Sequence, residues 1–174
     1  MNHLKGHVRF IGISPGDRRI RLERKAFIGV VSRGSSLIEG IIKGEAEWNG
    51  DDATERVAGS ITSSPYYKQI RCIFLEELYL AGSNKLDMKE LYGITRTPVV
   101  LVIRDGFPEL SEHTPKEDLI NVGPLNFFAI GFKGRGAGDA IKASLGDHKI
   151  PEALVVARKI ATAYNNFMRR GTIK

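Results

Sequence analysis

The chain has 174 residues, of which 42% are apolar and 26% charged, and its formal net charge at neutral pH is +6. This length fits one globular domain with a hydrophobic core, over residues 1–174. The first ten residues lack the apolar stretch of a signal peptide, and no run is long enough to span a membrane, so we expect a cytoplasmic protein. The single cysteine, Cys72, excludes an intrachain disulfide and argues against a cysteine-based zinc site.

Three strands are predicted before any helix, over residues 8–14, 26–32 and 37–48. The turns between them are short and rich in glycine, serine and proline, at residues 14–17 and 33–36. Connections of this kind join antiparallel neighbours, so we expect the three strands to form a meander.

Helices then alternate with strands. Asp52 and Glu55 have the spacing of a capping box, which predicts a helix from there to about residue 63. An apolar strand begins at Ile70, a short helix follows over residues 87–92, and residues 98–103 form a strand that is apolar throughout. Strands joined in this way are parallel. Three antiparallel strands followed by parallel ones is the order of elements in the ribonuclease H fold.

Four features are predicted beyond residue 103. Thr114-Pro115 opens a short helix, and residues 125–130 form a strand that we expect at an edge of the sheet. The glycine-rich basic stretch at residues 131–138 leads to a helix start at Asp139. It is either a phosphate cradle or a flexible connector, and its spacing is that of neither nucleotide-binding fingerprint. A last amphipathic helix begins at Pro151. Its apolar stripe consists of Leu154, Ala157, Ala161, Tyr164 and Met168.

The positive charge is concentrated in two places. Residues 17–25 carry five basic side chains, among them Arg18, Arg19 and Arg21, and residues 169–174 carry three more. Such clusters attract phosphate backbones. A solvated hairpin in a basic protein explains the first cluster equally well.

Two adjacent carboxylates, Glu76 and Glu77, follow directly after the strand that begins at Ile70. In open α/β sheets, functional sites form where the strands end. We therefore expect the chemistry of the protein at Glu76. Cys72 lies inside this strand, where a buried small apolar side chain is the expected role.

Four segments, in order, resemble landmarks of the archaeal family known as domain of unknown function 99. They are residues 49–56, 67–75, 97–104 and 150–157. That family is similar to endonuclease V, which cuts inosine-containing nucleic acid using magnesium. The resemblance implies an endonuclease V-like, ribonuclease H-like fold, with a three-layer α/β/α arrangement around a mixed sheet. It also implies a metal held by carboxylates at neighbouring strand ends, which activates water and clamps a phosphate.

The residues that match the catalytic positions of endonuclease V differ from it at two places. The aspartate of the first strand falls at Ser14, which lacks the charge that a magnesium site needs. The histidine of the last helix falls at Arg158, which cannot act as a general base but can hold a phosphate. Glu76 keeps the carboxylate of the central strand, and Arg104 stands where endonuclease V has a lysine. Asp17 is a second candidate ligand for the position of Ser14, although the intervening residues predict a turn.

Another acidic position of the family matches Asp51, Asp52 or Glu55, for which a structural role in the capping box is the preferred explanation. Three functions remain open. The first is a nucleic-acid-binding protein with a degraded nuclease site and no required cofactor, in which Arg104 and Arg158 contact DNA or RNA phosphates, helped by Arg18, Arg19 and Arg21. The second is an active nuclease that uses Glu76, Glu77 and Asp52, with Mg²⁺ or Mn²⁺ held by Glu76 and Asp51. The third is a structural or partner-binding domain whose cleft is filled.

Overall fold

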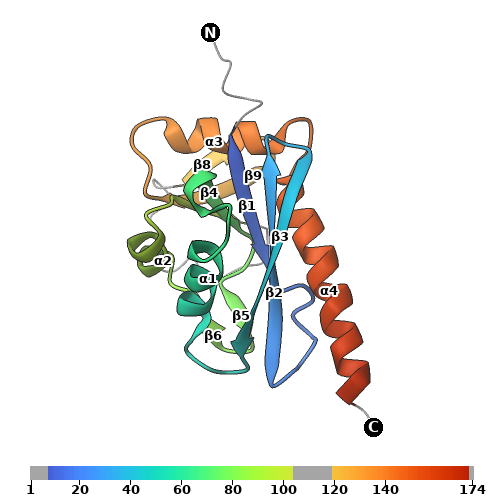
Figure 1. Cartoon of the computed structure of the whole chain (residues 1–174). Coiled ribbons are helices and arrows are strands. Elements are labelled where there is room, and N and C mark those ends of the chain that lie inside the picture. The colour runs from blue at the N-terminus through green and yellow to red at the C-terminus, as the bar shows by residue number, and fades with distance from the viewer. Residues whose placement is uncertain (1–7, 104–118, 173–174) are drawn as a thin grey trace.

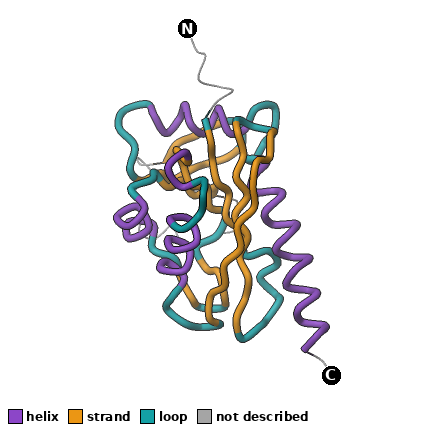
Figure 2. The backbone as a smooth tube through the Cα atoms, viewed as in Figure 1, coloured by secondary structure: helices purple, strands orange, loops and turns teal. Residues whose placement is uncertain are grey.

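A computed structural model describes residues 8–103 and 119–172 and shows a mixed sheet flanked by helices (Figure 1, Figure 2). The order of the seven strands in the sheet is β3-β2-β1-β4-β7-β9-β8. The strands are β1 (Arg9–Ser14), β2 (Arg24–Arg33), β3 (Leu37–Glu47), β4 (Ile70–Leu75), β7 (Val99–Ile103), β8 (Leu119–Val122) and β9 (Leu125–Ile130). A small separate hairpin consists of β5 (Tyr79–Ala81) and β6 (Asn84–Lys85).

The strand directions follow the predicted pattern. β1, β2 and β3 form an antiparallel meander, and β4 pairs in parallel with both β1 and β7. The last two strands, β9 and β8, are added antiparallel to β7. The ribonuclease H-like arrangement expected from the sequence is therefore confirmed, and β1 and β4 end side by side at the same edge of the sheet.

Helices cover both faces of the sheet, as a three-layer arrangement requires. The helices are α1 (Ala53–Thr62), α2 (Met88–Thr95), α3 (Gly136–Leu145) and α4 (Glu152–Thr172), with a 3₁₀ turn, η1, at Tyr67–Gln69. Residues of α1 and α2 share one hydrophobic cluster with Ile11 and Ile13 of β1. Residues of α3 and α4 pack in the two clusters on the other face, against Phe10 and against β2.

Two local predictions are wrong. Asp52 is the N-cap of α1, but its side chain accepts no hydrogen bond from a backbone N–H in the first turn of that helix. Asn84 caps the helix instead, since its Oδ1 accepts from the Ala53 N–H at 2.9 Å. Strand β9 is not at an edge, because β8, which the sequence analysis did not find, pairs with its outer side.

The stripe predicted on α4 is correct only in its first half. Leu154, Ala157 and Ala161 are buried, whereas Met168 is 41% exposed. The buried residue of the second half is Asn165. The helix therefore leaves the core beyond this asparagine, as Figure 1 shows for the red C-terminal turns.

Several further predictions can be placed. Cys72 is fully buried, which raises the pKa of its thiol, as expected for a core residue. Helix α3 begins at Gly136, before the predicted start at Asp139. The helix predicted at Thr114 lies outside the described residues. None of the described helices is both long and apolar enough to cross a membrane.

Candidate functional site

Ser14 and Glu76 come together where β1 and β4 end. The strands are in register up to Ile13 and Leu75, so the next residue of each chain segment lies at the same edge of the sheet. Both side chains are buried, and the Ser14 Oγ donates a hydrogen bond of 2.5 Å to Oε1 of Glu76. The same Oγ accepts from the Gly16 N–H at 3.1 Å. The proton of the serine hydroxyl is thus donated to the carboxylate of Glu76.

Helix α4 brings Arg158 to this carboxylate. Two glycines allow the close approach: a Cβ on Gly12 would lie 2.7 Å from the Leu154 nitrogen, and one on Gly16 would lie 2.5 Å from the Thr162 nitrogen. Arg158 lies between these two contacts along the helix, and its Nη1 is 3.9 Å from Oε2 of Glu76. The guanidinium is 46% exposed, so it contacts both the buried acid and solvent.

Glu77 is the second buried acid, and its side chain is only 7% exposed. Burial raises the pKa of Glu77 to about 7, with a smaller rise from the neighbouring Glu76 and an opposing effect of Arg18. The Nε of Arg18 lies 3.2 Å from Oε2 of Glu77, but this oxygen accepts no hydrogen bond from the described residues. The contact is therefore an ion pair with poor hydrogen-bond geometry. Near neutral pH, Glu77 is about half protonated.

Lys25 and Asp17 complete the charges around the two acids. Lys25 is 2% exposed, and its Nζ donates to the Asp17 carbonyl oxygen at 2.8 Å. Burial lowers the pKa of Lys25, whereas Glu77 and Asp17 act in the opposite direction. The Arg19 side chain hydrogen-bonds the Asp17 carboxylate and holds its pKa well below the usual range. Asp17 is therefore paired with Arg19 in the loop between β1 and β2.

A pocket of ≈480 Å³ opens above these charges. Its lining consists of Asp17, Arg18, Arg19, Arg158 and Thr162. Three of the five side chains are arginines, and they come from the loop between β1 and β2 and from α4, more than one hundred residues apart in the sequence. Of the remaining predicted arginines, Arg21 is exposed and is not part of the pocket lining. Arg104 is outside the described residues.

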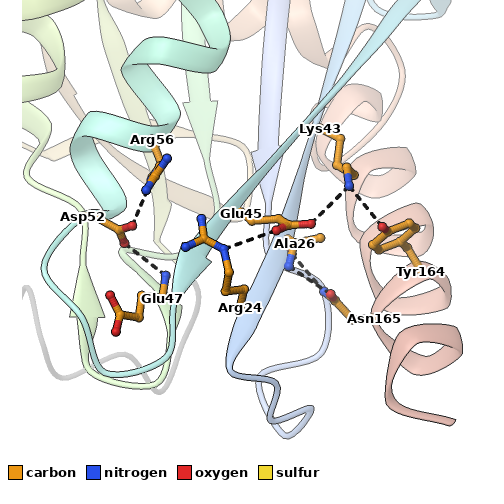
Figure 3. A network of polar contacts seen from close by, with 9 residues as sticks. All are labelled: Arg24, Ala26, Lys43, Glu45, Glu47, Asp52, Arg56, Tyr164 and Asn165. Carbon is orange, nitrogen blue, oxygen red and sulfur yellow. Dashed lines mark hydrogen bonds and ion pairs between the residues drawn. The ribbon is translucent and has the colours of Figure 1, made fainter. Parts of the chain in front are cut away.

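The predicted acids of the first helix lie apart from the pocket. Asp52 accepts from the Glu47 N–H and forms an ion pair with Arg56 at 2.9 Å (Figure 3). It also accepts from the side chain of Asn84. These contacts tie the end of β3 to the start of α1. Asp51 is exposed at the same turn. Asp52 thus serves the connection between strand and helix in this structure.

The side chains beside Glu76 do not suit the divalent cation that the resemblance implies. Magnesium takes about six oxygen ligands and draws on carboxylate charge. Glu76 instead receives the hydroxyl of Ser14 on one oxygen and faces the cationic Arg158 with the other. Nowhere in residues 8–103 and 119–172 do three histidine, cysteine or acidic side chains gather into a possible metal site.

Sequence reasoning missed the residue that fixes α4 against the site. Asn165 is fully buried, accepts from the Ala26 N–H at 3.0 Å and donates to the Ala26 carbonyl oxygen (Figure 3). It also donates to the Pro15 carbonyl oxygen. These bonds link the helix to β2 and to the loop that carries Arg18. The available signal was a polar side chain four residues beyond Ala161, on the apolar stripe of the helix.

Comparison with known proteins gives one family and one fold. Residues 6–114 match the family described as Endonuclease dU. A UPF0215 protein of Thermococcus sibiricus is 31% identical over 184 residues, which cover 92% of this chain and 93% of that protein. A UPF0215 protein of Methanosarcina barkeri is 34% identical over 110 residues, which are 63% of this chain and 55% of the relative. The matched part thus spans about half the length of the Methanosarcina protein.

Two solved structures are similar to the whole fold. A protein of unknown function from Archaeoglobus fulgidus has a TM-score of 0.76 and 26% identity, covering 90% of this chain and 98% of that one. Endonuclease V of Ciona intestinalis, solved with an inosine-containing DNA, has a TM-score of 0.59 and 10% identity, covering 92% of this chain and 87% of that one. These matches confirm both resemblances seen in the sequence. The chain belongs to the Endonuclease dU family and has an endonuclease V-like fold.

Proposed function

We propose that this protein binds nucleic acid through the arginine-lined pocket and that its metal-dependent nuclease site is weakened or lost. The observation that carries the proposal is the convergence of Arg18, Arg19 and Arg158 on one pocket beside the ends of β1 and β4. Guanidinium groups match the geometry of phosphate oxygens and bind them through paired hydrogen bonds. Arg21 and Arg104 are further phosphate contacts in this proposal.

The state of Glu77 favours an anionic ligand. Because its pKa is about 7, the pocket loses a negative charge as the pH falls through neutrality, while the arginines keep theirs. Arg18 and Arg158 have the role of direct ligands, since each side chain lines the pocket and is 46% exposed, while it also faces a glutamate at 3.2 Å and 3.9 Å, respectively. Arg19, which hydrogen-bonds Asp17, contributes charge rather than a new contact.

The nature of the ligand follows from the family and the fold. The matching family is described as Endonuclease dU, and the similar endonuclease V structure contains DNA with an inosine. We therefore propose DNA or RNA with a deaminated base, deoxyuridine or inosine, as the ligand class. Ser14 and Arg158 support binding without metal-dependent cleavage, because a hydroxyl and a cation adjoin the one acid of the central strand.

Fluorescence anisotropy with labelled oligonucleotides tests this proposal. Strands with deoxyuridine, with inosine and without either are titrated in a salt series, using the wild type, Arg158→Ala and Arg18→Ala. We expect about tenfold weaker binding for each variant. The slope of the logarithm of affinity against the logarithm of salt concentration should also become shallower by about one for each lost arginine.

Arg33→Ala is the matched control. Arg33 is also half-exposed and forms an ion pair with an acid, Glu39, at 3.0 Å. It lies roughly 17 Å along β2 from Ile28, the residue that pairs with Ser14 of the site. Its removal should leave binding unchanged. Equal losses in Arg33→Ala and Arg158→Ala, or binding that does not respond to salt, would contradict the proposal. If no oligonucleotide binds or raises the melting temperature, the structural or partner-binding interpretation replaces it.

A second candidate function is retained because of Glu77. A buried carboxyl with a pKa about 7 has the properties of a general acid or base, and it lies next to Glu76 in a family described as an endonuclease. Incubation with deoxyuridine- or inosine-containing DNA and RNA, with Mg²⁺ or Mn²⁺, tests this candidate. Cleavage that persists through purification and disappears in Glu76→Gln would make an active nuclease the better description.

A further inference from the structure

A second pocket, of ≈350 Å³, lies at the opposite edge of the sheet, where β4 and β7 begin. Its walls are η1, the first residues of β4 and the connection from α2 to β7. Three of the lining side chains are the exposed cations Lys68, Arg71 and Arg96, one from each wall. None of the described residues that line the pocket is acidic. The three positive charges therefore face one cavity without a neutralising carboxylate in its lining.

An irregularity of the sheet places Arg71 at this pocket. Arg9 of β1 pairs with Ile70, whereas the next residue, Phe10, pairs with Cys72. Arg71 is thus an extra residue with no partner on β1, which is the arrangement of a β-bulge. A bulge changes the direction of a side chain, and here an arginine within a buried central strand becomes exposed.

Arg96 occupies a backbone conformation that normally favours glycine. It ends α2 with φ 55° and ψ 18°, in the left-handed region, and its N–H donates to the Tyr92 carbonyl oxygen. Glycine is the usual residue at this position of a helix end, because a side chain there is strained. The sequence keeps an arginine at this cost in stability, which a functional role of the side chain explains.

The floor of the pocket is held by hydrogen bonds. The Tyr67 hydroxyl donates to the Thr95 carbonyl oxygen at 2.7 Å, which joins η1 to the connection beyond α2. The Thr95 hydroxyl donates to Leu91 O at 2.8 Å and accepts from the Thr97 N–H at 3.2 Å. The backbone that carries Lys68 and Arg96 is therefore fixed before any ligand arrives, which lowers the entropy cost of binding.

We propose that this second pocket binds a phosphate group, carried by a nucleotide or by the backbone of a polynucleotide, through Lys68, Arg71 and Arg96. The site shares no lining residue with the arginine-lined pocket, so it stands or fails independently of the proposed function. Two arginines and a lysine around one cavity supply the charge and the directed donors that a phosphate dianion requires.

Isothermal titration of the full chain with inorganic phosphate, a 5′-mononucleotide and a short single-stranded oligonucleotide tests the proposal. Arg96→Gly is the decisive variant. It removes the guanidinium and also relieves the left-handed strain, so it should melt at the same temperature as the wild type or higher, while its affinity for phosphate falls about tenfold. Lys68→Ala and Arg71→Ala should weaken phosphate binding to a similar extent.

Two controls isolate the pocket. Lys89→Ala removes an exposed cation from the first turn of α2, outside the pocket lining, and should leave the affinity unchanged. Arg158→Ala removes a proposed phosphate contact of the first pocket, so phosphate binding that persists in this variant and is lost in Arg158→Ala/Arg96→Gly belongs to the second pocket. If only the mononucleotide, or only the oligonucleotide, competes with inorganic phosphate, that compound carries the phosphate that the pocket binds. Either result supports the site. Absence of phosphate binding, or equal affinity in the wild type and Arg96→Gly, would overturn the proposal.

Discussion

Glu77→Gln tests the charge balance of the candidate site directly. Burial raises the pKa of the Glu77 carboxyl from 4.5 to about 7, and Glu76 acts in the same direction. Arg18, Lys25 and Arg158 oppose the rise but do not cancel it. Glutamine has nearly the shape of the protonated acid and does not titrate, so the substitution removes the proton equilibrium and retains the packing.

The expected magnitude follows from the difference between the folded and unfolded pKa values. Between pH 4.5 and about 7 the folded protein keeps the Glu77 proton that the unfolded chain releases, so stability falls as the pH rises. The loss is complete above pH 7 and amounts to on the order of 3 kcal/mol for a shift of this size. Glu77→Gln should therefore be more stable than the wild type at pH 8, and this difference should shrink as the pH falls toward 5.

Urea denaturation of both proteins at pH values from 5 to 9 measures this difference. Glu45→Gln is a suitable control, since the hydrogen bond from Lys43 lowers the pKa of Glu45, which is the opposite direction to the shift of Glu77. Its stability curve should run parallel to that of the wild type. If the stability curve of Glu77→Gln is also parallel to that of the wild type, or if this variant is less stable at high pH, then the buried acid is ionised in the folded protein and the reasoning is wrong.

Three further substitutions test the remaining parts of the site. Ser14→Asp places a second carboxylate beside Glu76, so we expect a lower melting temperature in EDTA and recovery with Mn²⁺, whereas Mn²⁺ should leave the wild type unchanged; thermal shift assays measure both. Asn165→Ala leaves the buried N–H and C=O of Ala26 without partners and should lower the free energy of unfolding by about 3 kcal/mol in urea titrations. Gly12→Ala brings a Cβ within 2.7 Å of the α4 backbone and should push this helix away from β1. Anisotropy should then show weaker nucleic-acid binding, although none of the residues that line the pocket is substituted.

The fold was predictable to the extent that each element has a strong local pattern. Continuous apolar runs identified β4 and β7, and the turns at both ends of β2 identified the meander. β8 was missed because its four residues, Leu119–Val122, are half-buried or exposed and show no apolar run. Without β8, the last predicted strand had no outer neighbour and was placed at an edge.

The site was predictable in position but not in its electrostatics. Strand ends and the family resemblance led to Ser14, Glu76 and Arg158, which the structure brings together. The burial of Lys25 and Glu77 depends on how α4 packs against β1 and β2, and no local pattern records it. For the same reason the capping role of Asn84 was assigned to Asp52, which has the right spacing but has its side chain engaged by Arg56.

The proton on Glu77 links stability to the proposed ligand. The guanidinium groups of Arg18 and Arg158 lower the pKa of Glu77. A phosphate bound to both arginines neutralises their charge and adds negative charge beside the carboxyl. The pKa of Glu77 must then rise further in the complex, so binding takes up a proton and grows weaker as the pH increases through about 7. In Glu77→Gln this part of the pH dependence should vanish while the salt dependence remains. A divalent cation in the same cleft would give the opposite sign, because a metal ion favours the ionised acids and releases protons on binding.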